Sequence, residues 1–341
     1  MYNHILSSRL IGVFTHINPD GDALGSSLGL AGYLEQLGKD YFIFLPSEPG
    51  EALSFMIPAE IRHKIMVWGT DSPEEIVSRV KSCDLMICLD FNQPSRSGAF
   101  SQQIIDSAAT KILVDHHVGP DTEHFNLIYS KPEASSTCEL LYSLLMDMPD
   151  INSDASKLST LTRESLLTGM TTDTNNFANS TNPQTFIMAS RLIEAGTDRD
   201  KILDKLYFSY PLRRIKAQAY IMDKLLKITD EGVSYIIVDR RTRKKLGLQE
   251  GDSEGFVNVP LSIAQVRMSI MLRVEPDSQK VRVSIRSKKG ISARNMAMQY
   301  FNGGGHEQAS GGRLTIGKEI RSQKELATYV ENCIHTFFKE Q

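Results

Sequence analysis

One stretch near the N-terminus, LIGVFTHINPDGDALGSSLGLAGYLEQL at residues 10–37, decides the fold of this 341-residue chain. Its apolar beginning, Leu10 to Thr15, is typical of a buried strand, and residues 23–37 have the periodicity of an amphipathic helix. Further strand-like stretches, separated in several places by helical patterns, occur at residues 41–45, 64–68, 85–90 and 111–115. Such alternation predicts an α/β fold with a mostly parallel sheet that is flanked by helices on both faces.

The second half of the chain follows a different pattern. Helical periodicity dominates residues 135–226, and strand-like segments return after residue 233. A predicted helix at 293–301 leads into the glycine-rich loop Gly303-Gly304-Gly305-His306. The length of the chain predicts more than one domain. We expect an N-terminal domain at 1–195, a helical linker at 196–230 and a smaller C-terminal α/β domain at 231–341.

The composition sets limits on the partners. Hydrophobic residues make up 41% and charged residues 23% of the chain, as in ordinary globular proteins. A formal net charge of −3 provides no global positive field, so no long nucleic-acid partner is implied. The four cysteines lack paired metal-ligand spacing and are typical of reduced core residues. Without a signal peptide or a membrane-length apolar run, we expect a cytoplasmic protein with no membrane partner.

Four short segments within the first 175 residues contain the groups that a divalent-metal site needs. They are His16-Ile17-Asn18-Pro19-Asp20-Gly21-Asp22, then Asp90, then Asp115-His116-His117, and finally Asp173. The first three follow predicted strands, and open α/β sheets bind ligands beyond the carboxyl ends of their strands. Carboxylates and imidazoles bind divalent cations, and crowded acids need positive charge nearby. Each aspartate alone is also compatible with a helix cap, but together they predict a two-metal phosphoesterase.

These segments resemble the motifs of the DHH phosphoesterase superfamily, which occur here in the family's order. Residues 303–311, with the sequence GGGHEQASG, resemble the glycine-rich signature of the DHH-associated domain. The resemblance therefore covers nearly the whole chain. Within the superfamily it is similar to the oligoribonucleases that also dephosphorylate 3′-phosphoadenosine 5′-phosphate (pAp), a group known as nano-RNases. It implies two divalent metal ions, Mn²⁺ in most members, with Mg²⁺ or Co²⁺ as alternatives.

The resemblance also implies a role for each motif residue. His16 and Asp20 would bind one metal, and Asp90 would bridge to the second. That second metal would be bound by Asp22, His116 and Asp173. Asp115 would orient its neighbours, and His117 would face the scissile phosphate to stabilise charge or protonate the leaving oxygen. A water shared by the two metals would lose a proton and attack phosphorus in line.

Substrate recognition is expected in the C-terminal domain. The candidate residues there are Arg286, Ser287, Arg294, Gly304, Gly305 and His306. Arginine can bind a terminal phosphate through two hydrogen bonds, and the imidazole can stack on a base next to an accessible glycine backbone. Surface ion pairs and a helix-terminating turn are the competing interpretations. The resemblance implies short RNA oligonucleotides, linear dinucleotides such as pApA or pGpG, and pAp as substrates held between two domains, and a homodimer.

Several other functions are compatible with parts of this pattern. An inorganic pyrophosphatase of the same superfamily shares the first four motifs, but the glycine-rich loop and Arg294 suit nucleotide recognition better. A long-strand exonuclease of the RecJ type is disfavoured by the absence of a basic stripe. The missing membrane segments disfavour a membrane-bound cyclic-dinucleotide phosphodiesterase. A non-catalytic nucleotide-binding or sensing module stays open, although no expected metal ligand is replaced.

Overall fold

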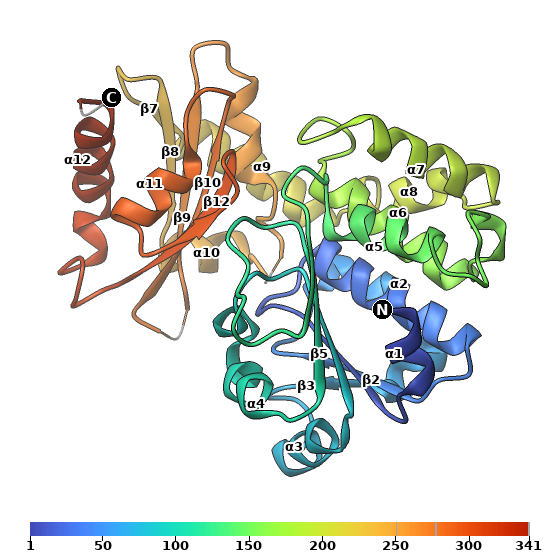
Figure 1. Cartoon of the computed structure of the whole chain (residues 1–341). Helices are drawn as coiled ribbons and strands as arrows, with labels where there is room; N and C mark the ends of the chain where they lie inside the picture. The colour runs from blue at the N-terminus through green and yellow to red at the C-terminus, as the bar shows by residue number, and fades with distance from the viewer. Residues whose placement is uncertain (250, 277, 340–341) are drawn as a thin grey trace. The chain divides into compact units, whose positions relative to one another are not determined.

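A computed structural model describes residues 1–249, 251–276 and 278–339 of the chain (Figure 1). Two compact units are present, Met1–Ser209 and Tyr210–Gln341, and each is described by itself. The segment expected to be a linker, 196–230, contains α8 (Arg199–Tyr207) in the first unit and α9 (Leu212–Lys224) in the second. Within the described ranges, no helix is both long enough and apolar enough to cross a membrane.

The first unit is built on a six-stranded sheet, as the alternation of strands and helices predicts. Its strands are β1 (Ile11–Phe14), β2 (Tyr41–Leu45), β3 (Ile65–Val67), β4 (Leu85–Leu89), β5 (Thr110–Asp115) and β6 (Leu127–Ser130). Their order is β3-β2-β1-β4-β5-β6, and every neighbouring pair is parallel. The fold class is therefore confirmed. β6 was not predicted, because its apolar run of Leu127 to Tyr129 is too short to identify a strand from the sequence.

Helices cover both faces of this sheet. They are α1 (Tyr2–Ser7), α2 (Gly21–Gln36), α3 (Pro73–Ser82), α4 (Ser101–Asp106), α5 (Thr137–Met146), α6 (Thr160–Asp173), α7 (Pro183–Glu194) and α8. Along β1, Ile11 and Val13 belong to the core shared with α2, α5 and α6, whereas Phe14 belongs to the core shared with α3 and α4. This alternation is the two-residue period of a strand that is buried on both faces.

The strand order places a topological switch point between β1 and β4. From β1 the chain proceeds outward to β2 and β3, then returns to the other side of β1 with β4. In open parallel sheets of this order, the two loops at the switch point diverge and leave room for a ligand beyond the carboxyl ends of the strands. His16 follows β1 and Asp90 follows β4, so both lie at this position.

Glycines allow α2 and α6 to approach closely. An added Cβ at Gly25 of α2 would lie 2.7 Å from the carbonyl oxygen of Ser165 and 2.9 Å from Cα of Gly169, both on α6. Backbone atoms in a packed helix pair cannot shift easily to relieve such contacts. The approach matters for the site, because α2 contains Asp22 and α6 ends at Asp173.

Gly25→Ala is therefore expected to destabilise the first unit by about 1–3 kcal/mol, although alanine favours a helix more than glycine. The measurement is urea unfolding followed by circular dichroism. Gly304→Ala provides a control, since no described heavy atom lies within 4 Å of a Cβ added there. An unchanged unfolding midpoint for Gly25→Ala would contradict the close helix contact.

The second unit contains a mixed sheet in the order β11-β12-β10-β9-β8-β7. Its strands are β7 (Lys227–Ile228), β8 (Val233–Val238), β9 (Met268–Val274), β10 (Lys280–Ser287), β11 (Gly304–Gly305) and β12 (Ala309–Thr315). Among the described strands of the second unit, only β8 and β9 pair in parallel. The short strands β7 and β11 were not predicted, because two-residue edge strands have no periodic pattern.

The helices of the second unit lie on opposite faces of this sheet. They are α9, α10 (Arg240–Leu246), α11 (Ala293–Tyr300) and α12 (Leu326–Lys339). Apolar residues of α11 and α12 share one core with the sheet, and Ile221 of α9 belongs to a second, smaller core on the other face. Short 3₁₀ helices complete both units at Glu51–Met56, Ala59–Lys64, Pro94–Phe100, Ala155–Lys157, Phe256–Ser262 and Gln323–Glu325.

Candidate metal centre

The turn between β1 and α2 supplies the first group of polar side chains. Asp20 is the N-cap of α2, and its Oδ1 accepts hydrogen bonds of 3.1 Å from the amides of Asp22 and Ala23. The same oxygen lies 3.8 Å from Nε2 of His16, and the Asp20 side chain is 63% exposed. Asp20 therefore combines the capping role that a single aspartate suggests with a position beside a candidate metal ligand.

Asp90 occupies the centre of the site. It follows β4 directly with a φ of 65°, a conformation that is uncommon for residues other than glycine and is often found at functional sites. Its Oδ2 lies 3.3 Å from Nε2 of His16, whereas its Oδ1 lies 3.7 Å from Nε2 of His116. The two oxygens of one buried carboxylate thus face two different imidazoles.

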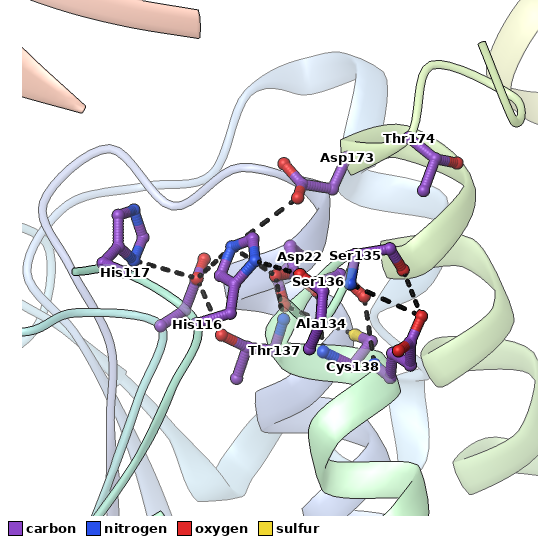
Figure 2. A network of polar contacts seen from close by, with 12 residues as sticks. Asp22, His116, His117, Ala134, Ser135, Ser136, Thr137, Cys138, Asp173 and Thr174 are labelled. Carbon is purple, nitrogen blue, oxygen red and sulfur yellow. Dashed lines mark hydrogen bonds and ion pairs between the residues drawn. The ribbon is translucent and has the colours of Figure 1, made fainter. Parts of the chain in front are cut away.

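A second set of side chains gathers around His116 (Figure 2). Nε2 of His116 lies 3.8 Å from Oδ2 of Asp22 and 3.6 Å from Oδ2 of Asp173. Asp22 is almost completely buried, and its two oxygens accept hydrogen bonds from the amides of Thr137 and Cys138 at 2.7 and 2.9 Å. The first turn of α5 therefore fixes the orientation of this carboxylate.

The predicted ligands form two donor clusters that share Asp90, and Asp90 also belongs to a third group with Asp115 and His117. His16, Asp20 and Asp90 make up the first, and Asp22, Asp90 and His116 make up the second, with all donor atoms of each cluster within 4.8 Å of one another. Asp173 extends the second cluster. Such carboxylate and imidazole sets, joined by one shared carboxylate, fit a pair of divalent cations. All six residues predicted as ligands are brought together.

Asp115 and His117 form a pair at the end of β5. Oδ1 of Asp115 lies 2.6 Å from Nδ1 of His117, and Oδ2 accepts a hydrogen bond from the backbone amide of His117. Asp115 is fully buried, so the imidazole is held in one orientation by a carboxylate that water does not reach. Because Nδ1 is engaged by Asp115, Nε2 is the ring nitrogen of His117 that would act in chemistry.

The crowding of acids shifts several pKa values. Burial opposes ionisation of Asp90, but the hydrogen bond and charge of His16 and the nearby histidines hold its pKa well below the usual range. Burial and repulsion from Asp90 and Asp173 raise the pKa of Asp22. Burial lowers the pKa of His116, but Asp173, Asp22 and Asp90 outweigh it and raise the value to about 9. Without a cation, protons and imidazolium groups balance the carboxylates.

Metal binding is therefore expected to release protons. A metal ligand must be a neutral imidazole, whereas His116 keeps its proton up to a pH of about 9 in the metal-free protein. At pH 7 a cation displaces this proton. The apparent affinity of the protein for the cation therefore decreases as the pH is lowered. Calorimetric titration with Mn²⁺ in buffers of different ionisation enthalpy measures the number of protons released. Binding without proton release at pH 7 would contradict the raised pKa.

The residues predicted to recognise substrate lie in the second unit. Arg286 is on β10, where its side chain donates to the carbonyl of Ile285 at 2.9 Å, and Ser287 donates its hydroxyl to the carbonyl of Ile291 at 2.6 Å. Arg294 is half-buried in the first turn of α11. Gly304 and Gly305 form β11, which pairs with Gly311 and Ser310 of β12. His306 follows, with its amide bonded to the carbonyl of Ala309.

One element of the site was missed in the sequence. Residues 134–138, with the sequence ASSTC and here named the 134–138 segment, lead into α5 and contact the clusters. Besides the two amides that bind Asp22, the hydroxyl of Thr137 donates to Oδ1 of Asp90 at 2.9 Å. The pattern Ser136-x-x-Glu139 signals the start of a helix, but no local pattern shows which distant carboxylate that helix start will meet.

Comparison with known proteins agrees with this geometry. The model of the DHH family N-terminal domain matches residues 10–170, and that of the DHHA1 domain matches residues 221–333. A bifunctional oligoribonuclease and PAP phosphatase, NrnA of Thermus thermophilus, is 30% identical over 306 residues, which cover 89% of this chain and 83% of that protein. The chain belongs to the DHH family.

Two further proteins are similar to almost the whole length of the chain. A crystal structure of an exopolyphosphatase-related protein from Bacteroides fragilis has a TM-score of 0.88 and 31% identity, covering 98% of this chain and 94% of that one. The cyclic-di-AMP phosphodiesterase PdeA of Listeria monocytogenes is 25% identical over 96% of this chain but only 48% of its own length. The family is thus shown, whereas the substrates named for these relatives differ.

Proposed function

We propose that this protein is a metal-dependent phosphoesterase that hydrolyses short oligoribonucleotides or linear dinucleotides to mononucleotides, and pAp to AMP. The observation that carries the proposal is the pair of donor clusters joined by Asp90 at the switch point of the first unit. The relative NrnA, with its named oligoribonuclease and PAP phosphatase activities, supports this substrate class over others.

The predicted ligands fit two cations. His16, Asp20 and Asp90 would hold one ion, and Asp22, Asp90, His116 and Asp173 would hold the other. Mn²⁺ is our candidate, with Mg²⁺ or Co²⁺ as alternatives, since mixed nitrogen and oxygen ligation suits these ions. When bound, the ions would supply a nucleophile at neutral pH and neutralise charge on the phosphate oxygens.

The chain itself supplies orientation and proton transfer. Asp115 fixes the Nδ1 side of His117, so that Nε2 can donate a proton to the leaving oxygen or stabilise charge on the phosphate. In the second unit, Arg286, Ser287, Arg294, Gly304, Gly305 and His306 are our candidates for holding the nucleotide. We include a homodimer in the proposal, and also a cytoplasmic location, in line with four free, buried cysteines.

The test is a turnover panel with added Mn²⁺. It contains short RNAs of increasing length, linear pApA and pGpG, cyclic dinucleotides, pAp and pyrophosphate. We expect turnover of short RNA and linear dinucleotides, slower turnover of long RNA, and release of AMP from pAp. Hydrolysis of pyrophosphate alone would replace the proposal with the pyrophosphatase alternative. Binding of nucleotides without any turnover would indicate a sensing module instead.

A further inference from the structure

The 134–138 segment contacts three of the candidate metal ligands, of which Asp22 and His116 are labelled in Figure 2. The carbonyl of Ala134 lies 3.2 Å from Nδ1 of His116. Because a carbonyl only accepts, Nδ1 bears the proton, and a neutral His116 presents the lone pair of Nε2 to the cluster. Thr137 bonds Asp90 through its hydroxyl, and Thr137 and Cys138 bond Asp22 through their amides. One short segment therefore orients ligands that lie directly after β4, directly after β5 and in α2.

A buried carboxylate holds this segment in place. Glu139 is 5% exposed, and its Oε2 accepts hydrogen bonds of 2.6 Å from the hydroxyls of Ser135 and Thr185. Its Oε1 accepts from the amide nitrogen of Asn182 at 3.0 Å. Asn182 and Thr185 form the capping box of α7, so Glu139 ties the 134–138 segment to the start of that helix. A buried anion is tolerated here because neutral donors surround it.

Ordinary helix capping does not require this network. The hydroxyl of Ser136 already caps α5 by accepting from the amide of Glu139 at 3.0 Å. The Glu139 side chain reaches back to Ser135 and across to α7, and the Thr137 hydroxyl points to Asp90. These contacts are additional to those that start α5. Together they connect the start of α7 with the 134–138 segment and with the shared carboxylate of Asp90.

We infer that Thr137 and Glu139 are positioning residues, which hold Asp90, Asp22 and His116 in a metal-binding arrangement before a cation arrives. The inference rests on the proposed function in that it takes these three side chains as metal ligands. Partners that orient metal ligands typically contribute about 10–100-fold to metal affinity. Loss of the Thr137 hydroxyl or of the Glu139 charge should therefore weaken metal binding while the fold is kept.

The experiment measures Mn²⁺ binding to the full chain after removal of metals with a chelator. Thr137→Val removes the hydroxyl at nearly constant shape, Thr137→Ser restores it, and Glu139→Gln removes the charge. Thr168→Val is the matched control, because Thr168 is equally buried but donates its hydroxyl to the backbone of Glu164 within α6. Calorimetry is expected to show about 10–100-fold weaker binding for Thr137→Val and Glu139→Gln, with Thr137→Ser and Thr168→Val close to the wild type.

Two results would overturn the inference: wild-type affinity in both Thr137→Val and Glu139→Gln, or a failure of Thr137→Ser to restore binding. Circular dichroism of the metal-free variants reports on folding, and if Thr137→Val does not fold, Glu139→Gln decides the outcome. A different result would disprove the proposed function without affecting this inference. A wild-type chain that binds Mn²⁺ but hydrolyses no nucleotide would disprove the phosphoesterase and leave the metal-binding comparison valid.

Discussion

Asp90→Asn is expected to lower kcat/KM for linear dinucleotides by at least about 10³-fold, equivalent to about 4 kcal/mol of transition-state stabilisation. The reason is geometric. Oδ2 of Asp90 faces His16 and Oδ1 faces His116, so loss of this one charge affects both donor clusters. Asparagine tolerates the φ of 65° at this position, which keeps the backbone of the β4 loop unchanged. Steady-state kinetics measure the effect on turnover, and Mn²⁺ titration measures the effect on metal binding.

A matched control separates this effect from a general loss of an aspartate. Asp150 accepts a hydrogen bond of 2.8 Å from the hydroxyl of Tyr33, and an asparagine amide oxygen can accept the same bond. Asp150→Asn should therefore bind Mn²⁺ and turn over substrate like the wild type. If Asp90→Asn kept turnover within about tenfold of the wild type, the shared-carboxylate arrangement would be wrong.

Much of the first unit could be predicted because its signals are local and regular. Buried strands such as β1 and β4 appear as continuous apolar runs, and each run ends at a charged or imidazole side chain. In a parallel sheet these ends lie at one edge, so the strand pattern alone predicts that His16, Asp90 and Asp115 lie near one another. The structure brings the six predicted ligands together within the first unit.

The contacts missed in the sequence depend on tertiary packing. The hydrogen bonds of Asp22 come from residues more than one hundred positions further along the chain, so no spacing rule relates them. A glutamate three residues after the N-cap of a helix usually belongs to a capping box, so the sequence does not indicate a function for Glu139 at the site. Two of its hydrogen-bond partners, Asn182 and Thr185, lie at the start of another helix. Side-chain networks of this kind follow from the packing of α5 against α7.

His117→Ala is expected to lower kcat by about 10²–10⁴-fold while Mn²⁺ binding is kept. Nδ1 of His117 lies 3.8 Å from Oδ1 of Asp90, but this nitrogen is bonded to the buried carboxylate of Asp115 at 2.6 Å. Because that bond engages Nδ1, Nε2 is the nitrogen that would act on the substrate, and the substitution removes proton transfer or charge stabilisation. Single-turnover kinetics at saturating Mn²⁺ isolate this step from metal loading and product release.

Asp115→Asn tests whether the orientation of His117 matters as well as its presence. Both ring nitrogens of His117 donate at once only in the imidazolium form, which the buried carboxylate of Asp115 stabilises and a neutral asparagine does not. If His117 acts through its bond to Asp115, Asp115→Asn should lower kcat nearly as much as His117→Ala does. The double variant should then lower kcat little further. Independent, additive losses in the two single variants would show that Asp115 acts elsewhere, because residues that act as one unit are not additive.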